Sequence, residues 1–305
     1  MAVLLVAVAL IGCDGSNSGS APAAKVDAVM TTFYPTEYFA SRISGGAVKV
    51  ECPLPDDADP AYWQPPAEAL TRYQNATLVV LNGANFENWV RTASLPFSRT
   101  CDTAKVFEGE FIKFEGVKHS HGAQGEHSHE GIDGHTWLDP VNAQRQAEQV
   151  LLAMTRAWPQ HEKAMRDNFA TLDTDLKRLD ARLRVVSAAG PVAVLASHPA
   201  YNYLGRRYGW TVTNVDFPPD EAPTTERLAA LKSALGGAPG LMLFEEAPLP
   251  EIATALEAMQ VKSVAFVPTE SLSAADRTAG RDYLTSMNDN IDTLARALGR
   301  PVPPK

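Results

Sequence analysis

Two histidines occupy positions at which an imidazole side chain can bind a metal ion. His198 follows directly after the apolar run at residues 192–196, which predicts a buried strand, and open α/β sheets bind their ligands at the carboxyl ends of such strands. His135 stands just before a predicted helix that begins at Pro140. Neutral imidazole is a good ligand for Zn²⁺, which needs about three or four donors. Either histidine alone is equally well explained as a hydrogen-bonded structural residue, but the two positions together favour a metal site.

A histidine-rich segment leads into the first of these two residues. Residues 118–134 have no apolar period and are rich in Gly, Gln, Ser and Glu, so we expect a mobile loop. Several imidazoles on such a loop would collect metal ions weakly, because the loop must be ordered each time an ion binds. A neutral tract without a task is the alternative, and the paired spacing favours collection. The four histidines are His119, His121, His127 and His129.

The segments around these histidines alternate between strand and helix patterns. This alternation predicts the α/β class, with parallel sheets that helices cover on both faces. In the first half of the chain, strands are predicted at residues 26–33, 48–53 and 76–81. In the second half, strands are predicted at residues 192–196, 211–215, 240–244 and 263–267.

A long helix is predicted between the two α/β halves. Apolar residues recur there at alternating steps of four and three, which is the pattern of one buried helical stripe. The helix would be about 35 Å long, enough to join two domains. We therefore expect an N-terminal α/β lobe at residues 26–158, a linking helix at 159–189 and a C-terminal α/β lobe at 190–299. The stripe consists of Met165, Phe169, Leu172, Leu176, Leu179, Leu183 and Val186.

The N-terminus has the features of an exported lipoprotein. Residues 1–12 are apolar and uncharged, too short to span a bilayer, and they are followed by Cys13. We expect residues 1–13 to be a signal peptide with a lipobox whose cysteine is lipidated, and residues 14–25 to be a flexible tether. No Lys or Arg precedes the apolar run, and the alternative is a buried N-terminal strand with a chance cysteine. Firm anchoring requires more than one acyl chain.

Two further cysteines and the overall charge bear on compartment and partners. Cys52 and Cys101 are compatible with a disulfide in an oxidising compartment, and two separate buried thiols explain them equally well. The formal net charge of −9 argues against a general affinity for nucleic acid. The sequence contains neither a His-Glu-x-x-His pattern nor a nucleophile elbow, which weighs against a zinc hydrolase.

Five segments resemble the zinc and manganese solute-binding proteins of bacterial ABC importers. The most specific is HTWLDP at residues 135–140, and the resemblance covers about residues 26–298. It implies two Rossmann-like lobes joined by one long helix, a metal ion bound between the lobes, and a membrane permease as partner. A histidine-rich loop is frequent in the zinc-specific members of this family. The other segments are TTFYP at 31–35, NGANFENW at 82–89, HPAYNY at 198–203 and FEE at 244–246.

The sequence departs from this family at two expected ligand positions. The first histidine of the family pattern falls on Ala61, and a late aspartate falls near residues 267–268. His135 and His198 are carried over by the resemblance. A carboxylate is expected to complete the site, with Glu246 preferred over its neighbour Glu245 and over Asp59. A histidine of the loop folding in, or weak metal binding, are the alternatives.

These observations predict a periplasmic, membrane-anchored lipoprotein that captures a divalent metal ion and delivers it to a permease. Zinc is expected in preference to manganese, because manganese prefers carboxylate-rich sites. We expect a monomer without catalytic activity, in which Asp139 fixes the tautomer of a ligating imidazole. The alternatives are a zinc-dependent hydrolase with a metal-bound water, and a degenerate family member that acts as an adhesin or accessory protein.

Overall fold

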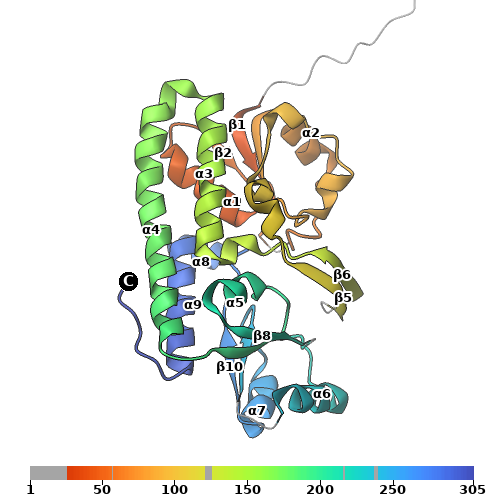
Figure 1. The fold of residues 1–305 in the computed structure, drawn as a ribbon. Coiled ribbons are helices and arrows are strands. Elements are labelled where there is room, and N and C mark those ends of the chain that lie inside the picture. The colour runs from red at the N-terminus through yellow and green to blue at the C-terminus, as the bar shows by residue number, and fades with distance from the viewer. Residues whose placement is uncertain (1–25, 57, 121–125, 216, 237–239) are drawn as a thin grey trace, which may run out of the picture.

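The protein is described from a computed structural model, which covers residues 26–56, 58–120, 126–215, 217–236 and 240–305 (Figure 1). The predicted signal peptide, the lipidated Cys13, the tether at 14–25 and His121 lie outside the described residues. No helix among the described residues is long and apolar enough to cross a membrane.

The first lobe is built on a four-stranded parallel sheet in the order β2-β1-β3-β4. Successive strand residues point to opposite faces, so one face of β3 packs on the long helices through Leu78 and Val80. The other face packs Val79 and Leu81 against Trp89. The elements of this sheet and its first two helices are β1 (Val26–Thr31), α1 (Tyr34–Ser44), β2 (Val50–Glu51), α2 (Ala67–Asn75), β3 (Ala76–Leu81) and β4 (Thr100–Asp102).

Most described residues of the histidine-rich segment lie in strands, so the prediction of a loop at residues 118–134 was wrong for residues 118–120 and 126–132. Strand β5 (Lys113–Ser120) pairs antiparallel with β6 (Glu126–Ile132), and His119 is opposite His127 in the register. These strands contain few apolar residues, so no apolar period in the sequence indicates them. Backbone hydrogen bonds between strands do not require an apolar face.

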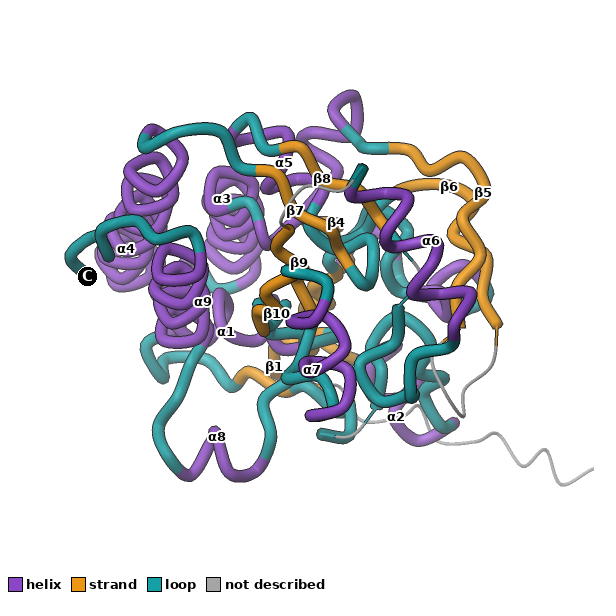
Figure 2. The backbone as a smooth tube through the Cα atoms, turned by 90° about the horizontal axis from the view of Figure 1, so that it is seen from below, coloured by secondary structure: helices purple, strands orange, loops and turns teal. Residues whose placement is uncertain are grey.

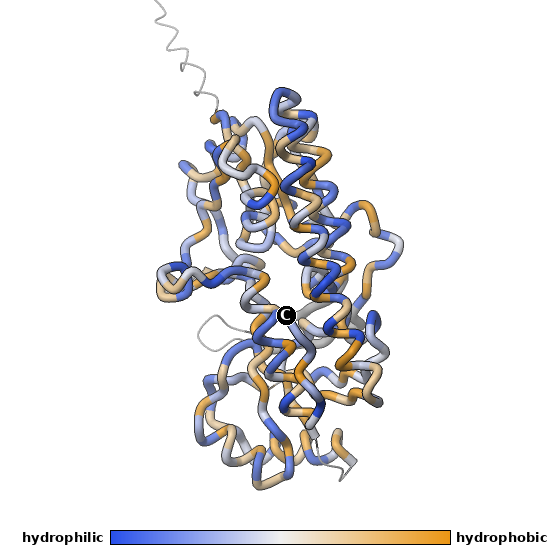
Figure 3. The backbone as a smooth tube through the Cα atoms, turned by 90° about the vertical axis from the view of Figure 1, so that its left-hand side faces the viewer, coloured by the Kyte–Doolittle hydropathy of each residue, from blue (hydrophilic) through white to orange (hydrophobic). Residues whose placement is uncertain are grey.

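Helices α3 (Pro140–Ala157) and α4 (Glu162–Ala188) connect the first lobe to the second. Helix α4 has 27 residues and is therefore about 40 Å long. It packs against α1 of the first lobe and α9 of the second, so it spans both (Figure 1). Apolar and polar residues alternate along the long helices (Figure 3), and every member of the predicted stripe except the partly buried Phe169 is buried.

The second lobe repeats the architecture of the first. Its four strands are parallel, in the order β10-β9-β7-β8. Seen from below, α9 lies on one side of these strands and α6 and α7 lie on the other (Figure 2). The predicted α/β class with two lobes and a long helix is thereby confirmed. The elements are β7 (Ala193–Ala196), α5 (Asn202–Tyr208), β8 (Thr211–Asn214), α6 (Thr225–Leu235), β9 (Gly240–Phe244), α7 (Pro250–Ala258), β10 (Val261–Ala265), α8 (Ala274–Thr278) and α9 (Tyr283–Ala297).

One hydrophobic cluster runs through both lobes. It contains Val80 of the first sheet, Leu179 of α4 and Leu243 of the second sheet. The two lobes are therefore not packed as separate cores joined by a bare linker. The exact lobe boundaries given above stay predictions.

Cys52 and Cys101 are free thiols. Cys52 follows β2 and Cys101 lies in β4, which are the two outer strands of the first sheet. Strands lie about 4.8 Å apart, so three strand spacings separate the two cysteines by about 14 Å, beyond the reach of a disulfide. Burial raises the pKa of Cys52 to about 11 and that of Cys101 to about 12, which keeps both thiols protonated at neutral pH.

Candidate metal centre

The structure brings His135 and His198 together at the junction of the two lobes. His135 directly precedes the short helix Thr136–Leu138 and α3, and His198 follows β7. The centroids of the two imidazole rings are 5.4 Å apart and the rings are inclined at 79°. Both residues are buried. Two imidazoles that are 63 positions apart in the sequence therefore face one another, as the sequence analysis required.

A carboxylate completes the group. The potential ligand atoms of His135, His198 and Glu245 all lie within 4.8 Å of one another, and His198 Nε2 is 3.7 Å from Glu245 Oε1. Donors on one tetrahedral Zn²⁺ are about 3.4 Å apart, since each lies about 2.1 Å from the metal. A small contraction of this group would therefore bring all three donors within bonding distance of one ion.

The carboxylate at this junction belongs to Glu245, whereas the sequence analysis preferred its neighbour Glu246. The reason is the alternation of side chains along a strand. Leu241 and Leu243 of β9 face the cluster that both lobes share, and Glu245 continues this series. Glu246 continues the opposite series and is exposed.

A second carboxylate, which the sequence analysis missed, lies beside the first-lobe histidine. Glu270 Oε1 is 3.3 Å from His135 Nε2, and the backbone N–H of Tyr34 donates to the Glu270 carbonyl. Glu270 lies in the segment after β10, three residues beyond the position where the family pattern places its late aspartate. A carboxylate shortly after the predicted strand was the available signal. The left-handed backbone of Thr269 (φ 62°) turns the chain just before this carboxylate, and the sequence pattern does not predict such a turn.

Asp59 lies close to this group, and its predicted role as a metal ligand stays a prediction. Its Oδ1 accepts a hydrogen bond from the backbone N–H of Ala61 at 2.8 Å and so shapes the turn. Its charge is one of the causes that raise the pKa of Glu245. Ala61 offers no donor side chain, and its carbonyl accepts hydrogen bonds from the backbone and the side chain of Asn88.

Asp133, and not the predicted Asp139, orients the first histidine. Asp133 Oδ1 lies 2.9 Å from both the backbone nitrogen and the ring Nδ1 of His135. Nδ1 is thereby held as a donor, and Nε2 is directed towards the other lobe. The carboxylate of Asp139 instead accepts from Arg207 and from the backbone N–H of Val141 at the start of α3, because it caps that helix.

A buried polar network fixes the chain on both sides of His135. Asn82 Nδ2 donates to the carbonyl of Gly134 at 2.9 Å, and Thr136 Oγ1 donates to Asn82 Oδ1 at 3.1 Å. Gln146 of α3 donates to the same Asn82 oxygen at 2.9 Å. Asn82 therefore holds both neighbours of the histidine without touching it.

Charge is concentrated at the lobe junction. Burial and the carboxylate of Glu270 raise the pKa of Glu245 to about 8, although His135 opposes this. Burial lowers the pKa of His135, but hydrogen bonds to Asp133 and Glu270 raise it further, and the result lies well above the ordinary value. Without a cation the site therefore holds protons, and a divalent ion would replace them.

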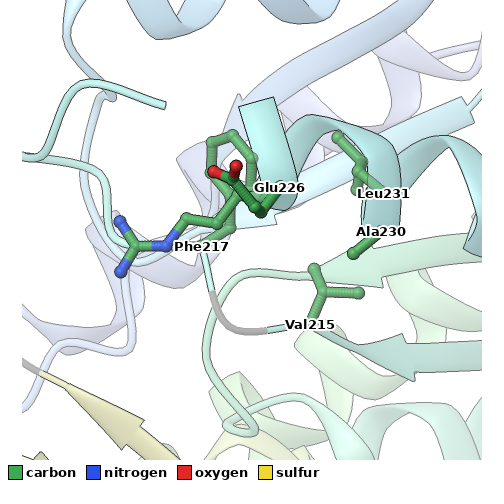
Figure 4. Close-up of a pocket in the computed structure, with 6 residues that line it drawn as sticks. Val215, Phe217, Glu226, Ala230 and Leu231 are labelled. Atoms are coloured by element: carbon green, nitrogen blue, oxygen red, sulfur yellow. The ribbon is translucent and has the colours of Figure 1, made fainter. Parts of the chain in front are cut away.

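A separate cavity of about 370 Å³ in the second lobe is not part of this group. Phe217 and Leu231 are among the residues that line it, between the end of β8 and α6 (Figure 4). None of the histidines or carboxylates described above lines it.

The auxiliary role in metal collection that the sequence predicts for His119, His121, His127 and His129 stays a prediction.

The two lobes, the joining helix and the histidines and carboxylates at their junction define a class, the two-lobed binding proteins with a metal-type donor set. Residues 29–297 match the family model described as "Zinc-uptake complex component A periplasmic", and the chain belongs to this family. The resemblance given in the sequence analysis is thereby confirmed.

Individual relatives agree with this family assignment. The chain is 29% identical to "Zinc-binding lipoprotein AdcA" of Streptococcus pneumoniae over 303 residues, which cover 95% of this chain and 58% of that protein. It thus spans little more than half of that relative's length. It is 28% identical to "High-affinity zinc uptake system protein ZnuA" of Bacillus subtilis, covering 94% of this chain and 92% of that protein. The Zn(II)-bound ZnuA-like domain of S. pneumoniae AdcA superposes with a TM-score of 0.75 at 26% identity, over 90% of this chain and 98% of that one.

Proposed function

We propose that this protein is the extracytoplasmic solute-binding component of an ABC importer, which captures Zn²⁺ between its lobes and delivers it to a membrane permease. The observation that carries the proposal is the convergence of His135 from the first lobe with His198 and Glu245 from the second. Glu270 is the fourth donor in this proposal, because its Oε1 lies 3.3 Å from His135 Nε2, the ring nitrogen that is directed towards the other lobe. Two relatives that cover nearly all of this chain are named as zinc-binding or zinc-uptake proteins.

The donor set suits a borderline-soft divalent cation. Imidazole nitrogens and carboxylate oxygens are both common zinc ligands, and four protein donors complete a tetrahedral shell. Carboxylates also suit manganese, so zinc is the preferred and not the exclusive cargo. The cation would neutralise carboxylates that otherwise repel one another or hold protons.

Capture and release follow from the division of donors between lobes. A small separation of the lobes would remove the His135 donor from the other three and weaken the hold on the ion. Hydrogen bonds across the junction support closure in the present arrangement: Trp137 Nε1 donates to the Pro268 carbonyl at 2.7 Å, and Tyr283 Oη donates to the Trp137 carbonyl at 2.7 Å. Docking on the permease would have to break such contacts.

Location and partners complete the proposal. A lipid on Cys13 would anchor the chain outside the cytoplasmic membrane beside its permease, and the chain would act as a monomer. No contact with nucleic acid is proposed, because the net charge is −9.

Zinc titration with variants of the two histidines tests the proposal. The unsubstituted chain is expected to bind one Zn²⁺ tightly, and the double variant His135→Ala with His198→Ala is expected to lose at least about 100-fold in affinity, since two of four donors are gone. His161→Ala is the matched control, because His161 lies in the turn before α4, outside the group. Unchanged stoichiometric binding by the double variant would refute the site.

The hydrolase alternative has less support from this geometry. Catalytic zinc sites keep one position open for water, whereas the proposed set of His135, His198, Glu245 and Glu270 would fill all four positions. Absence of ester or peptide turnover by the zinc-loaded chain is expected. Purified protein with no bound metal and no zinc affinity would instead support the adhesin or accessory role.

A further inference from the structure

One surface of the first lobe gathers exposed apolar side chains. Phe97 is 96% exposed, and Val106 and Leu152 are exposed by 48% and 41%. All three line a single groove of about 790 Å³ between strand β4 and the second half of α3, which we call the β4–α3 groove. Because α3 begins beside His135, its second half lies at the end of the lobe away from the metal centre (Figure 1). Val106 follows the carboxyl end of β4 and lies nearer the metal centre, so the groove runs along the side of the lobe. Exposed apolar side chains gathered in one groove are typical of an interaction site.

The lining of the β4–α3 groove is basic, although the chain as a whole is acidic. Arg99, Lys105 and Arg156 line it, against the one lining carboxylate of Asp102. Lys105 also pairs with Glu108, whereas Arg156 is exposed at the rim. Exposed apolar side chains flanked by cations fit the headgroup region of an anionic bilayer, where the apolar groups leave water and the cations meet lipid phosphates.

The N-terminal end of the first lobe, at Val26, lies at the rim of this groove. Thr77 lines the groove, and its Oγ1 donates to the carbonyl of Val26 at 3.3 Å and to Asp27 at 3.1 Å. On the other side, Trp158 follows the lining residue Ala157, and its Nε1 donates to Asp27 at 3.2 Å. Residues 14–25 can reach at most about 40 Å when fully extended. An anchor at Cys13 would therefore keep this rim of the groove within about 40 Å of the membrane surface, so that the groove can reach the bilayer.

We propose that the β4–α3 groove rests on the anionic lipid bilayer, with Phe97 among the headgroups and Arg156 facing lipid phosphates. The metal centre then lies towards the other end of the first-lobe strands from these two residues. Delivery would require the chain to turn on its tether. This orientation of the chain on the membrane does not depend on its affinity for zinc, because none of the proposed donors lines the groove.

A tryptophan at position 97 of the full chain reports the contact directly. Phe97→Trp is mixed with phosphatidylglycerol vesicles whose acyl chains carry bromine, and the emission of the unsubstituted chain is subtracted. The emission of the tryptophan at position 97 is expected to shift to the blue. Bromine is expected to quench this emission at least about threefold more than the emission of Val185→Trp. Val185 is the matched control, because it is 53% exposed on α4, outside the groove. Equal quenching at both positions, or none at 97, overturns the proposal.

Charge variants test the lipid chemistry. Partition of Arg156→Ser onto phosphatidylglycerol vesicles is expected to fall about fivefold, since each cation near an anionic surface contributes about that factor. Arg178→Ser is the control, because Arg178 is exposed on α4. Unchanged partition of Arg156→Ser, or equal binding to phosphatidylcholine vesicles, overturns the proposal.

Other occupants of the groove would give different results. A blue shift at position 97 that needs no vesicles and grows with protein concentration assigns the groove to a second copy of the chain. A shift seen only with vesicles that contain the permease assigns it to that protein. Either result overturns the bilayer proposal. Zinc titration is run in parallel, and Phe97→Trp is expected to keep the unsubstituted affinity, so loss of the metal site and loss of the groove are told apart.

Discussion

Position 61 is the residue at which the donor set can be enlarged by a single change. The turn that contains it lies beside the metal centre. Burial raises the pKa of the neighbouring Tyr62 to about 12, and the nearby carboxylates of Asp59 and Glu270 add to this effect. We predict that Ala61→His adds a third imidazole and raises zinc affinity by about tenfold relative to manganese, since imidazole favours zinc. Chelator competition with both metals measures this.

The control for position 61 is Ala61→Asn, which adds a polar side chain of moderate size without an imidazole. An equal gain from both substitutions, or no gain from histidine, would show that the side chain at position 61 does not reach the ion.

The protonation of Glu245 and His135 leads us to predict that zinc affinity depends on pH. With the pKa of Glu245 at about 8 and the pKa of His135 raised well above its ordinary value, both groups hold protons at neutral pH. Zinc must displace these protons, so affinity is expected to rise with pH and to fall on acidification, by up to about tenfold per pH unit for each proton released. Calorimetry between about pH 6 and about pH 8.5, in two buffers of different ionisation enthalpy, counts the protons.

The variant Glu245→Gln sharpens this measurement. It removes one titrating group and one anionic donor, so the affinity should be lower and its dependence on pH less steep than in the unsubstituted chain. A slope that stays the same would mean that Glu245 gives up no proton when zinc binds.

The residues of the metal centre differ in how far the sequence could predict them. His135 and His198 were predictable because each stands beside the end of a regular element, whose position the apolar pattern fixes. Glu245 was predictable in principle from strand alternation, which the preference for Glu246 ignored. Glu270 was not, because the turn at Thr269 decides where the carboxylate points, and no propensity anticipates a left-handed threonine.

At the scale of elements, the loop after β3 and helix α3 act together on His135. Asn82 and Gln146 are fully or almost fully buried and bonded to one another. We predict that Asn82→Ala weakens zinc binding by about tenfold, although Asn82 touches no ion, because the neighbours of His135 lose their support. Isothermal titration against zinc measures the effect.

Asn168→Ala is the matched control for the loss of one hydrogen-bonded asparagine amide, which is partly buried. Asn168 of α4 donates to the carbonyl of Ile43 at 3.1 Å, in a different part of the first lobe. Both variants should lose stability by roughly 1 kcal/mol, but zinc affinity should fall only for Asn82→Ala. Equal zinc affinities would reduce the network to a purely structural role.

The elements also show where sequence patterns fail. The parallel strands other than β4, and helix α4, were predictable because apolar burial produces a period of two or of 3.6 in the sequence. Strand β4, only three residues long, was not predicted. The β5–β6 hairpin was missed because its residues at 118–132 include few apolar side chains, and pairing between its backbones leaves no such period. His119, His127 and His129 therefore lie on paired strands, and not on the loop that composition suggested.

At the scale of the whole molecule, α4 makes one folding unit of the two lobes. Leu179 is 1% exposed in the cluster that contains residues of both sheets. We predict that Leu179→Ala lowers the free energy of unfolding by about 2–5 kcal/mol, because it leaves a cavity in this shared core. The variant should still unfold in a single transition, and its zinc affinity should be nearly unchanged, since no donor lies on α4.

Calorimetric unfolding separates this prediction from the behaviour of independent lobes, which would melt in two steps with only one of them shifted. Val185→Ala on the same helix is the control, because Val185 is 53% exposed and its loss should change stability by no more than about 0.5 kcal/mol. Zinc should raise the melting temperature of the unsubstituted chain and of both variants by mass action, since it binds only where both lobes are folded and facing. Two resolved transitions in the Leu179→Ala chain, only one of which zinc shifts, would show that the shared cluster does not couple the lobes.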